Sequence, residues 1–328
     1  MTKKDLRIVF MGTPEFAVGT LQALVDGGYN IVAVVTQPDK PVGRHQDTLM
    51  PSAVKQYATS IGLPVLQPVK MKDPQFIEEL AGYHADLQVV VAFRMLPEVV
   101  WAMPRFGTFN VHAALLPQYR GAAPINWAVI NGEKQTGVTT FFLDHEIDTG
   151  RIIMQAPFDI KDDYNVEDVY DGLMKLGADL AIRTIDKIIE GDGHVDSLPQ
   201  EEMMPVGKEL HSAPKIFKET CQIDWTLPAL RIHNFVRGLS PYPGSWSNLT
   251  DNVGKSTVLK IFKTSLTDIT CDAKKQGTII VNSGHILVAT ADKWLQLDEI
   301  QLSGKKRMDA KAFLNGFRNI ENYMLTHV

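Results

Sequence analysis

Residues 87–92 read LQVVVA, a run that is apolar at every position except Gln88. Such a run is typical of a parallel strand that is covered on both faces. Similar runs occur at Arg7–Met11, Asn30–Thr36, Leu63–Gln67, Thr108–His112 and Gly137–Leu143. Helical patterns lie between or after them, at Pro14–Asp26, Pro51–Ile61, Asp73–Gly82, Pro124–Asn131 and Asn165–Glu190. This alternation predicts an α/β fold with a doubly wound, mostly parallel, Rossmann-like sheet.

The pattern changes after Asp192. Residues 193–215 mix Gly, Pro, Ser and charged residues, which is typical of a linker. A helix is predicted near Leu227–Gly238, and short alternating runs over 245–302 predict a small antiparallel, OB-like β-barrel. A final helix is predicted over Asp309–Leu325. The chain is therefore divided into an α/β domain over 1–192, a linker over 193–215 and a barrel domain over 216–328.

Composition excludes several classes of protein. The 328 residues are 45% hydrophobic and 22% charged, as in ordinary globular proteins, and no apolar run reaches the roughly 18 residues of a membrane span. The N-terminus lacks the pattern of a secretory signal. Cys221 and Cys271 form no CxxC pair, and the nine histidines include no HxH or HxxxH pair. We therefore expect a cytoplasmic protein with no metal and no membrane contact.

The net charge of −5 is unevenly distributed. Residues 207–328 carry 16 Lys and Arg against 11 Asp and Glu, whereas residues 1–206 carry 17 against 27. A basic C-terminal part beside an acidic N-terminal part suggests that the C-terminal part meets a polyanion, although an uneven surface charge of no consequence gives the same count.

The chemistry-bearing segment is NVHAALLPQYRGAAP over residues 110–124. Asn110 and His112 alternate on a predicted strand, so their side chains leave the same face. They lie at its C-terminal end, where open α/β sheets bind ligands. An amide beside an imidazole can stabilise a tetrahedral oxyanion and handle its proton. A single histidine near a strand end is more often structural, but the pair followed by Leu-Leu-Pro favours a functional role.

Two further turns are candidates for the same site. The run LDHEIDTG over 143–150 closes in a turn at Asp148, whose carboxylate could reach His112 and steer its proton; alternatively it is an acidic surface turn. The run GTPEF over 12–16 follows the first strand, with Thr13 placed to cap the next helix. It is neither GxGxxG nor a P-loop, so it implies neither a dinucleotide nor ATP.

Together these three segments resemble the folate-dependent formyltransferase family, and the resemblance covers nearly the whole chain. It implies that Asn110, His112 and Asp148 are the catalytic residues and that 10-formyltetrahydrofolate is the formyl donor. The residues that it implies for the folate pocket are Met95, Leu96, Ala114, Leu115, Leu116, Pro117 and Asp144. Arg94 stands where family members usually have a small residue, and it faces either the tail of the folate or solvent.

Within the family, the segments GTPEFA at 12–17, TQPDKPVGR at 36–44 and SGKKRM at 303–308 resemble members that formylate the amine of initiator methionyl-tRNA. This implies a role in translation initiation, with the barrel domain following the tRNA. The residues implied to meet the tRNA or its methionyl group are Gly12, Thr13, Phe16, Arg44, Lys305, Lys306 and Arg307. The loop after Arg44 reads HQDT and is less basic than in the family. Nothing requires more than a monomer.

Three alternatives remain open at this level. The acceptor can be an amino-sugar nucleotide, or water can replace the amine in a formyltetrahydrofolate hydrolase. A non-catalytic RNA-binding protein that kept the fold is the third alternative, against which the intact Asn110, His112 and Asp148 argue.

Overall fold

The computed structural model describes residues 1–42, 48–204, 207, 209–271 and 274–327. The chain forms two compact units. The first comprises Met1–Gly121, Gln135–Asp159 and Tyr170–Ser212, and the second comprises Ala122–Lys134, Ile160–Val169 and Ala213–Val328. Neither unit is continuous in sequence, because residues 122–134 and 160–169 pack with the C-terminal part.

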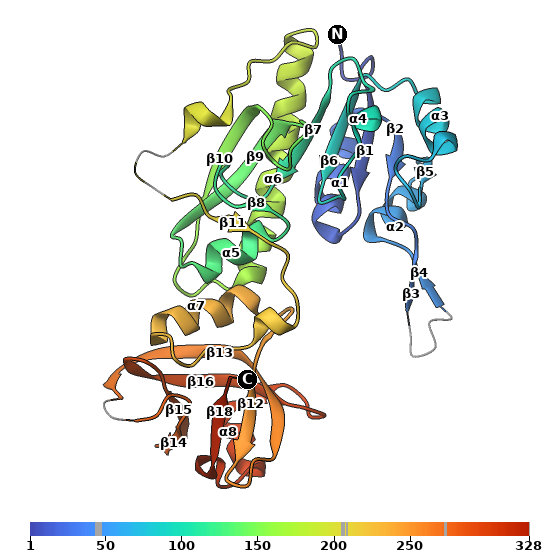
Figure 1. The fold of residues 1–328 in the computed structure, drawn as a ribbon. Coiled ribbons are helices and arrows are strands. Elements are labelled where there is room, and N and C mark those ends of the chain that lie inside the picture. Colours follow the sequence, from blue (N-terminus) through green and yellow to red (C-terminus); the bar gives the residue numbers. More distant parts are fainter. Residues whose placement is uncertain (43–47, 205–206, 208, 272–273, 328) are drawn as a thin grey trace. The chain divides into compact units, whose positions relative to one another are not determined.

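The first unit is built on a sheet in the order β10-β9-β7-β6-β1-β2-β5 (Figure 1). Its strands are β1 Arg7–Gly12, β2 Asn30–Val35, β5 Val65–Leu66, β6 Leu87–Val91, β7 Thr108–His112, β9 Gln135–Phe142 and β10 Ile152–Asp159. Strands β5, β2, β1, β6 and β7 are parallel, whereas β9 and β10 are each antiparallel to their neighbours. The predicted doubly wound, mostly parallel sheet is confirmed.

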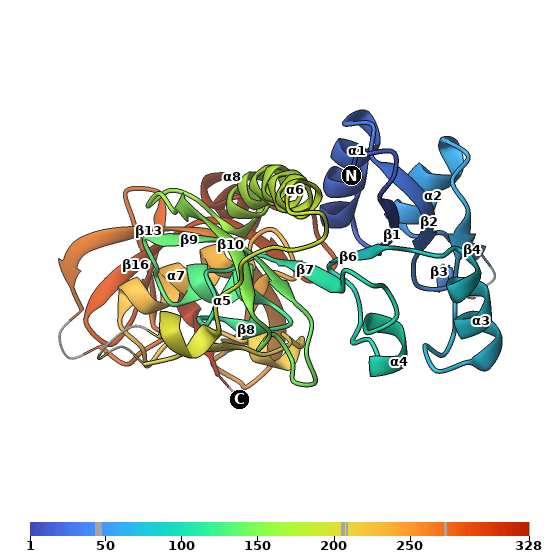
Figure 2. The same ribbon diagram turned by 90° about the horizontal axis from the view of Figure 1, so that it is seen from above.

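Helices cover both faces of this sheet. Helix α1 (Glu15–Asp26) and helix α6 (Val166–Glu190) lie on one face, with α2 (Ala53–Ser60) beside α1, while α3 (Pro74–Gly82) and α4 (Glu98–Trp101) lie on the other (Figure 2). On the second face Val9 and Met11 pack with Phe76 and Leu80 of α3. Each such buried side chain stabilises the fold by about 1.5–3 kcal/mol. Strand β6 is buried at every position, as its apolar run predicts.

N-terminal capping residues were predicted for two helices, α6 and α1. Asn165 does begin α6: its Oδ1 accepts from the backbone N–H of Glu167 (2.7 Å) and Asp168 (3.2 Å). The prediction for α1 is wrong. Pro14, in an extended conformation, is the N-cap residue there, and the hydroxyl of Thr13 makes no hydrogen bond among the described residues. The helix begins one residue later than the Pro-at-N1 pattern suggests.

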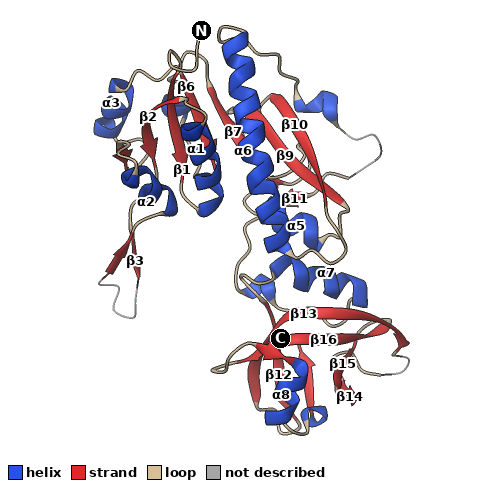
Figure 3. Ribbon diagram, turned by 180° about the vertical axis from the view of Figure 1, so that it is seen from behind, coloured by secondary structure: helices blue, strands red, loops and turns tan. Residues whose placement is uncertain are grey.

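The second unit holds an antiparallel sheet in the order β14-β15-β16-β13-β12-β18 (Figure 3). An isolated bridge between Thr278 and Met324 joins its two ends, so the sheet curls into the predicted small barrel. Helices α5 and α7 also belong to this unit. The bounds are β12 Ser245–Asp251, β13 Ser256–Thr270, β14 Ile279–Asn282, β15 His285–Ala289, β16 Lys293–Leu302, β17 Met308–Asp309, β18 Tyr323–Thr326, α5 Pro124–Ile130 and α7 Ala229–Leu239.

The predicted final helix over Asp309–Leu325 is wrong. Helix α8 spans only Ala310–Gly316 and is followed by a 3-10 turn at Ile320–Asn322 and by β18. Asn319 adopts a left-handed conformation (φ +62°) that a continuous helix does not allow. Leu325 then enters the barrel core from a strand that pairs with β12.

Several short elements were not predicted. The hairpin strands β3 (Lys40–Val42) and β4 (Thr48–Met50) pair with each other. Strand β11 (Ser212–Ala213) and the 3-10 helix η1 (Gln200–Met203) lie in the segment predicted as a linker, and no element was predicted at β8 (Arg120–Gly121) or at the 3-10 helix η2 (Glu219–Cys221). No helix in the described part of the chain is both long and apolar enough to cross a membrane.

Candidate active site

Strand β7 carries Asn110 and His112 to its C-terminal end. Their side chains share one face, and β6 and β9 flank them in register. The imidazole of His112 is 5% exposed and packs edge-on against the ring of Phe141, with centroids 6.3 Å apart. Its Nε2 lies 2.9 Å from the carbonyl oxygen of Tyr119. Because a carbonyl can only accept, Nε2 carries a proton, and Nδ1 is the ring nitrogen that can exchange one.

Asp148 faces that nitrogen. Its Oδ2 lies 3.7 Å from Nδ1 of His112 and also accepts a 2.8 Å hydrogen bond from the backbone N–H of Gly121. Asp148 has φ +55°, a conformation that is uncommon for residues other than glycine. The predicted proximity of the acid to the histidine is therefore observed.

The third member of the group, Asn110, has a buried side-chain oxygen, Oδ1, that is left without a partner among the described residues. A buried polar atom in this state typically costs about 1–3 kcal/mol of stability. Such atoms are rare in folded proteins, and one beside His112 on the same strand face is available to a reacting group.

The backbone of the strip after β7 is held by side chains of β9 and β10. Thr139 Oγ1 donates to the carbonyl of Ala114 (2.6 Å) and accepts from the N–H of Leu116 (3.0 Å). The carbonyl of Leu116 accepts from Gln155 Nε2 at 2.7 Å. Ala114, Leu116 and Pro117 are buried, and Leu115 packs against Gly137. Side chains of β9 and β10 thus fix the strip predicted to line the folate pocket.

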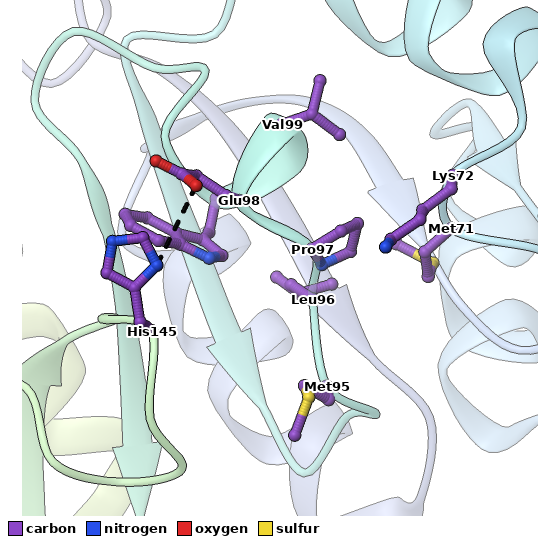
Figure 4. Close-up of a pocket in the computed structure, with 9 residues that line it drawn as sticks. Met71, Lys72, Met95, Leu96, Pro97, Glu98, Val99 and His145 are labelled. Carbon is purple, nitrogen blue, oxygen red and sulfur yellow. Dashed lines mark ion pairs between the residues drawn. The ribbon is translucent and has the colours of Figure 1, made fainter.

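A hollow of about 540 Å³ lies beside the start of α4 (Figure 4). Glu98 and His145 pair across 3.9 Å on one wall, and Lys72 stands on the opposite wall. Of the residues predicted for the folate pocket, the hollow contains Met95, which is 68% exposed, and Leu96, which is 7% exposed. It is lined by Met71, Lys72, Met95, Leu96, Pro97, Glu98, Val99, Trp101 and His145. Residues 114–117 and Asp144 are not among its walls.

Two charged residues near this hollow have defined partners. The guanidinium of Arg94 donates to the backbone carbonyls of Pro68 and Val69, and burial lowers the pKa of Arg94. Arg94 therefore ties two loops together, an arrangement that neither of its two predicted roles describes. Asp144 accepts a 2.7 Å hydrogen bond from the backbone N–H of its neighbour His145.

The residues predicted to meet the methionyl group lie at the end of β1. Gly12 permits a close approach, since a Cβ there would stand 2.6 Å from the Cβ of Ala17. The Thr13 hydroxyl is buried and makes no hydrogen bond among the described residues. Phe16 is 5% exposed and packs edge-on against Tyr170, so it belongs to the core between α1 and α6.

Arg44 lies outside the described residues, as does most of the atypical loop that follows it. The start of its hairpin is anchored by Asp39, which accepts from Lys55 and from Gln67, each at 2.7 Å. The hydrogen bond from Lys55 is the main cause that lowers the pKa of Asp39. Leu49 and Met50 of β4 are 64% and 55% exposed.

The three basic residues Lys305, Lys306 and Arg307 of the second unit differ in whether they pair with a carboxylate. Arg307 makes a bidentate pair with Glu299 (2.8 and 2.6 Å) and lies over the ring of Phe262. Lys305 and Lys306 are exposed, and neither pairs with a carboxylate among the residues that the structure describes. Only the two lysines thus present unpaired charge.

The sequence did not point to Gln200. It lies in the segment predicted as a linker, yet it is fully buried and donates to the carbonyl oxygens of Asp148 and Gly150. No period or motif marks a glutamine that is followed by two glutamates as buried, so only the folded chain reveals it. In the described part of the chain, no cluster of three His, Cys, Asp or Glu side chains could hold a metal ion.

Comparison with known proteins places this site in context. The family described as formyl transferase matches residues 6–185, and the formyl transferase C-terminal domain matches residues 215–318. Three relatives that bear the name methionyl-tRNA formyltransferase come from Parabacteroides distasonis, Bacteroides fragilis and Porphyromonas gingivalis. They are 58%, 55% and 46% identical to this chain; the alignments cover 98%, 100% and 97% of it and 99%, 100% and 97% of the relatives.

Solved structures share the fold at lower identity. An N-formyltransferase from Helicobacter canadensis, in complex with folinic acid and dTDP-3-aminofucose, aligns with a TM-score of 0.63 and 19% identity over 92% of this chain and 100% of that one. HypX from Aquifex aeolicus, in complex with tetrahydrofolic acid, aligns with a TM-score of 0.59 and 17% identity over 96% of this chain and 48% of that one.

Proposed function

This chain belongs to the formyl transferase family, and we propose that it transfers the formyl group of 10-formyltetrahydrofolate to the α-amine of initiator methionyl-tRNA. The product is N-formylmethionyl-tRNA, which serves translation initiation. Relatives of that name at 46–58% identity over nearly their full length support this acceptor. The observation that carries the chemistry is the buried His112–Asp148 pair beside Asn110, whose side-chain oxygen has no partner among the described residues.

The residues present fit the formyl donor. A backbone strip held by Thr139 and Gln155 follows the strand end that carries Asn110 and His112, and the hollow at Met95 and Leu96 has the volume of sites for ligands of this size. The donor supplies an activated formyl carbon. Leu115, Pro117 and Asp144 belong to the same proposed pocket by family resemblance.

Asn110, His112 and Asp148 would then act on the reacting atoms. The neutral amine attacks the formyl carbon, the new C–N bond forms, and the bond from that carbon to the donor nitrogen breaks. The Asn110 amide and the charged His112 stabilise the oxyanion. Nδ1 of His112, 3.7 Å from Asp148, mediates the proton that passes from the amine to the departing nitrogen. The Asp148 carboxylate faces Nδ1 of His112 and is not itself a nucleophile.

The acceptor tRNA is assigned to basic surfaces outside this centre. We assign residues 216–328 to tRNA binding, joined to a catalytic part over 1–192 by the segment 193–215. The net positive charge of residues 207–328 and the unpaired lysines 305 and 306 support this. Arg44, Gly12 and Thr13 are assigned to the acceptor end. Phe16 is buried below the turn at Gly12 and Thr13 and is assigned to holding that turn in place. Arg307 pairs with Glu299 and is assigned to holding the segment that carries the two lysines. The proposed setting is a monomer in the cytoplasm, where initiator tRNA is charged.

The test is a comparison of acceptors. Purified protein and 10-formyltetrahydrofolate are incubated with initiator methionyl-tRNA, elongator methionyl-tRNA or an amino-sugar nucleotide, and formylated product is quantified. Rapid formylation of the initiator alone is expected. Formylation of the amino sugar, or release of formate with no formylated acceptor, would show that the acceptor is wrong while the chemistry survives.

A further inference from the structure

We propose that Gln200 is a positioning residue for formyl transfer: it holds the turn Asp148–Gly150 so that the Asp148 carboxylate faces His112. The inference rests on the proposed function, in which Asp148 and His112 handle the proton. It extends the reacting centre to a segment that reads as a linker. Gln200 acts through Asp148, since its side-chain amide is engaged entirely with the protein.

Gln200 uses its whole hydrogen-bonding capacity. Its Nε2 donates to the carbonyl oxygens of Asp148 (2.8 Å) and Gly150 (2.9 Å). Its Oε1 accepts from Nε (3.0 Å) and Nη2 (2.7 Å) of Arg120. Two hydrogens and two lone pairs are all that a side-chain amide offers, and the residue is 0% exposed. A fully satisfied and fully buried amide specifies one geometry of its partners.

The contacts form a closed ring around Asp148. Arg120 binds Gln200 through its side chain, and the next residue, Gly121, donates its backbone N–H to Oδ2 of Asp148 at 2.8 Å. The same oxygen lies 3.7 Å from Nδ1 of His112. The ring therefore runs from the Asp148 carbonyl through Gln200 and Arg120 to Gly121 and back to the Asp148 carboxylate. A shift of Gln200 would therefore displace both the backbone carbonyl and the side-chain carboxylate of Asp148.

The turn needs such support. Asp148 has φ +55°, and non-glycine residues keep this conformation only where their surroundings hold it. At Gly150 the backbone approaches β9 so closely that a Cβ would stand 1.7 Å from the carbonyl oxygen of Phe142. Gln200 grips the carbonyls on both sides of Thr149 and thereby fixes the orientation of the peptides on which the Asp148 side chain depends.

The experiment replaces the amide without changing the side-chain volume much. In Gln200→Met, we expect kcat for formylation of initiator methionyl-tRNA to fall on the order of 100-fold, the effect of a misplacement of about 1 Å. The KM values for 10-formyltetrahydrofolate and for methionyl-tRNA should stay within about threefold, because the loss is confined to the reacting geometry.

Gln88→Met is the control for replacement of a buried glutamine outside the site; unlike Gln200, Gln88 has an Nε2 with no partner among the described residues. Gln88 is also 0% exposed and its Oε1 accepts from Thr108 (3.0 Å), but it lies near the start of β6, at the opposite end of the strands from Asn110 and His112. Its kcat should remain within about threefold of the unmodified protein. An equal fall in both variants would trace the effect to general loosening of the unit and would overturn the proposal.

Gln200→Glu decides the matter if Gln200→Met does not fold. Its carboxylate still accepts from Arg120 as an ion pair but cannot donate to the two carbonyls, so a cooperative melting transition at a lower temperature and a comparable fall in kcat are expected. Unchanged kcat in either Gln200 variant would overturn the positioning role. Asp148→Asn distinguishes the proton role of Asp148 from the positioning role of Gln200. A near-normal kcat in Asp148→Asn would contradict the proposed proton role itself. An inactive Asp148→Asn beside active Gln200 variants removes only this inference.

Discussion

The hydroxyl of Thr139 is predicted to stabilise the first unit through the strip that follows β7. Thr139 is 0% exposed, donates to Ala114 O, and accepts from Leu116 N and from Gln155 Nε2. Thr139→Val keeps the shape but leaves the backbone groups of Ala114 and Leu116 buried without this partner. Each unsatisfied group costs about 1–3 kcal/mol, so the free energy of unfolding should fall by about 2–6 kcal/mol.

Thr136→Val provides a control on the same strand. The hydroxyl of Thr136 is buried and makes no hydrogen bond among the described residues, so its removal should change stability by about 0.5 kcal/mol or less, or raise it. Urea unfolding of both variants, followed by tryptophan fluorescence, measures the difference. The KM for 10-formyltetrahydrofolate should rise in Thr139→Val alone. Equal losses of stability in the two variants would refute the assignment of those hydrogen bonds.

Two further predictions concern the second unit. Lys305→Ala and Lys306→Ala should each reduce the slope of log K for tRNA against log salt by about one, whereas Arg307→Ala should leave it nearly unchanged because Glu299 neutralises the guanidinium. Filter binding between about 50 and 200 mM salt tests this, and equal changes at all three positions would contradict it. The hydrogen bond from the backbone N–H of Ala229 is the main cause that lowers the pKa of Asp292. The resulting stability is present above the ordinary value of 3.8 and is lost as pH falls through the lowered one, so Asp292→Asn should flatten the acid dependence of urea unfolding; an unaltered dependence would count against the contact.

The interior of the first sheet was predictable because its strands are buried on both faces. The apolar run at β6 and the strand at Thr108–His112 both follow from this, and the latter is confirmed to the residue. The edge strand β10 was missed because it contains Pro157 and alternates irregularly, features that a sequence pattern assigns to loops. The prediction of a final helix over Asp309–Leu325 was wrong because the apolar residues there occur at helical spacing, whereas the left-handed conformation of Asn319 interrupts the helix.

The site was predictable only where chain neighbours define it. Asn110 and His112 share a strand face by alternation, and the turn after β9 brings Asp148 to them. Gln200 stands 50 or more residues from the groups that it binds, and Arg94 binds carbonyls 25 and 26 residues away. Contacts at such separations leave no local signal, because the sequence pattern records which residues are buried and not which partners they meet.

The most direct test of the proposed chemistry is the rate of initiator methionyl-tRNA formylation by Asn110→Ala under saturating donor and acceptor. The Nδ2–H of Asn110 is the proposed oxyanion donor, and loss of Oδ1, which has no partner among the described residues, breaks no hydrogen bond of that atom. A fall on the order of 100- to 1000-fold with native stability is expected for the loss of one oxyanion donor. A rate close to that of the unmodified protein would contradict the assignment of this strand end as the reacting centre.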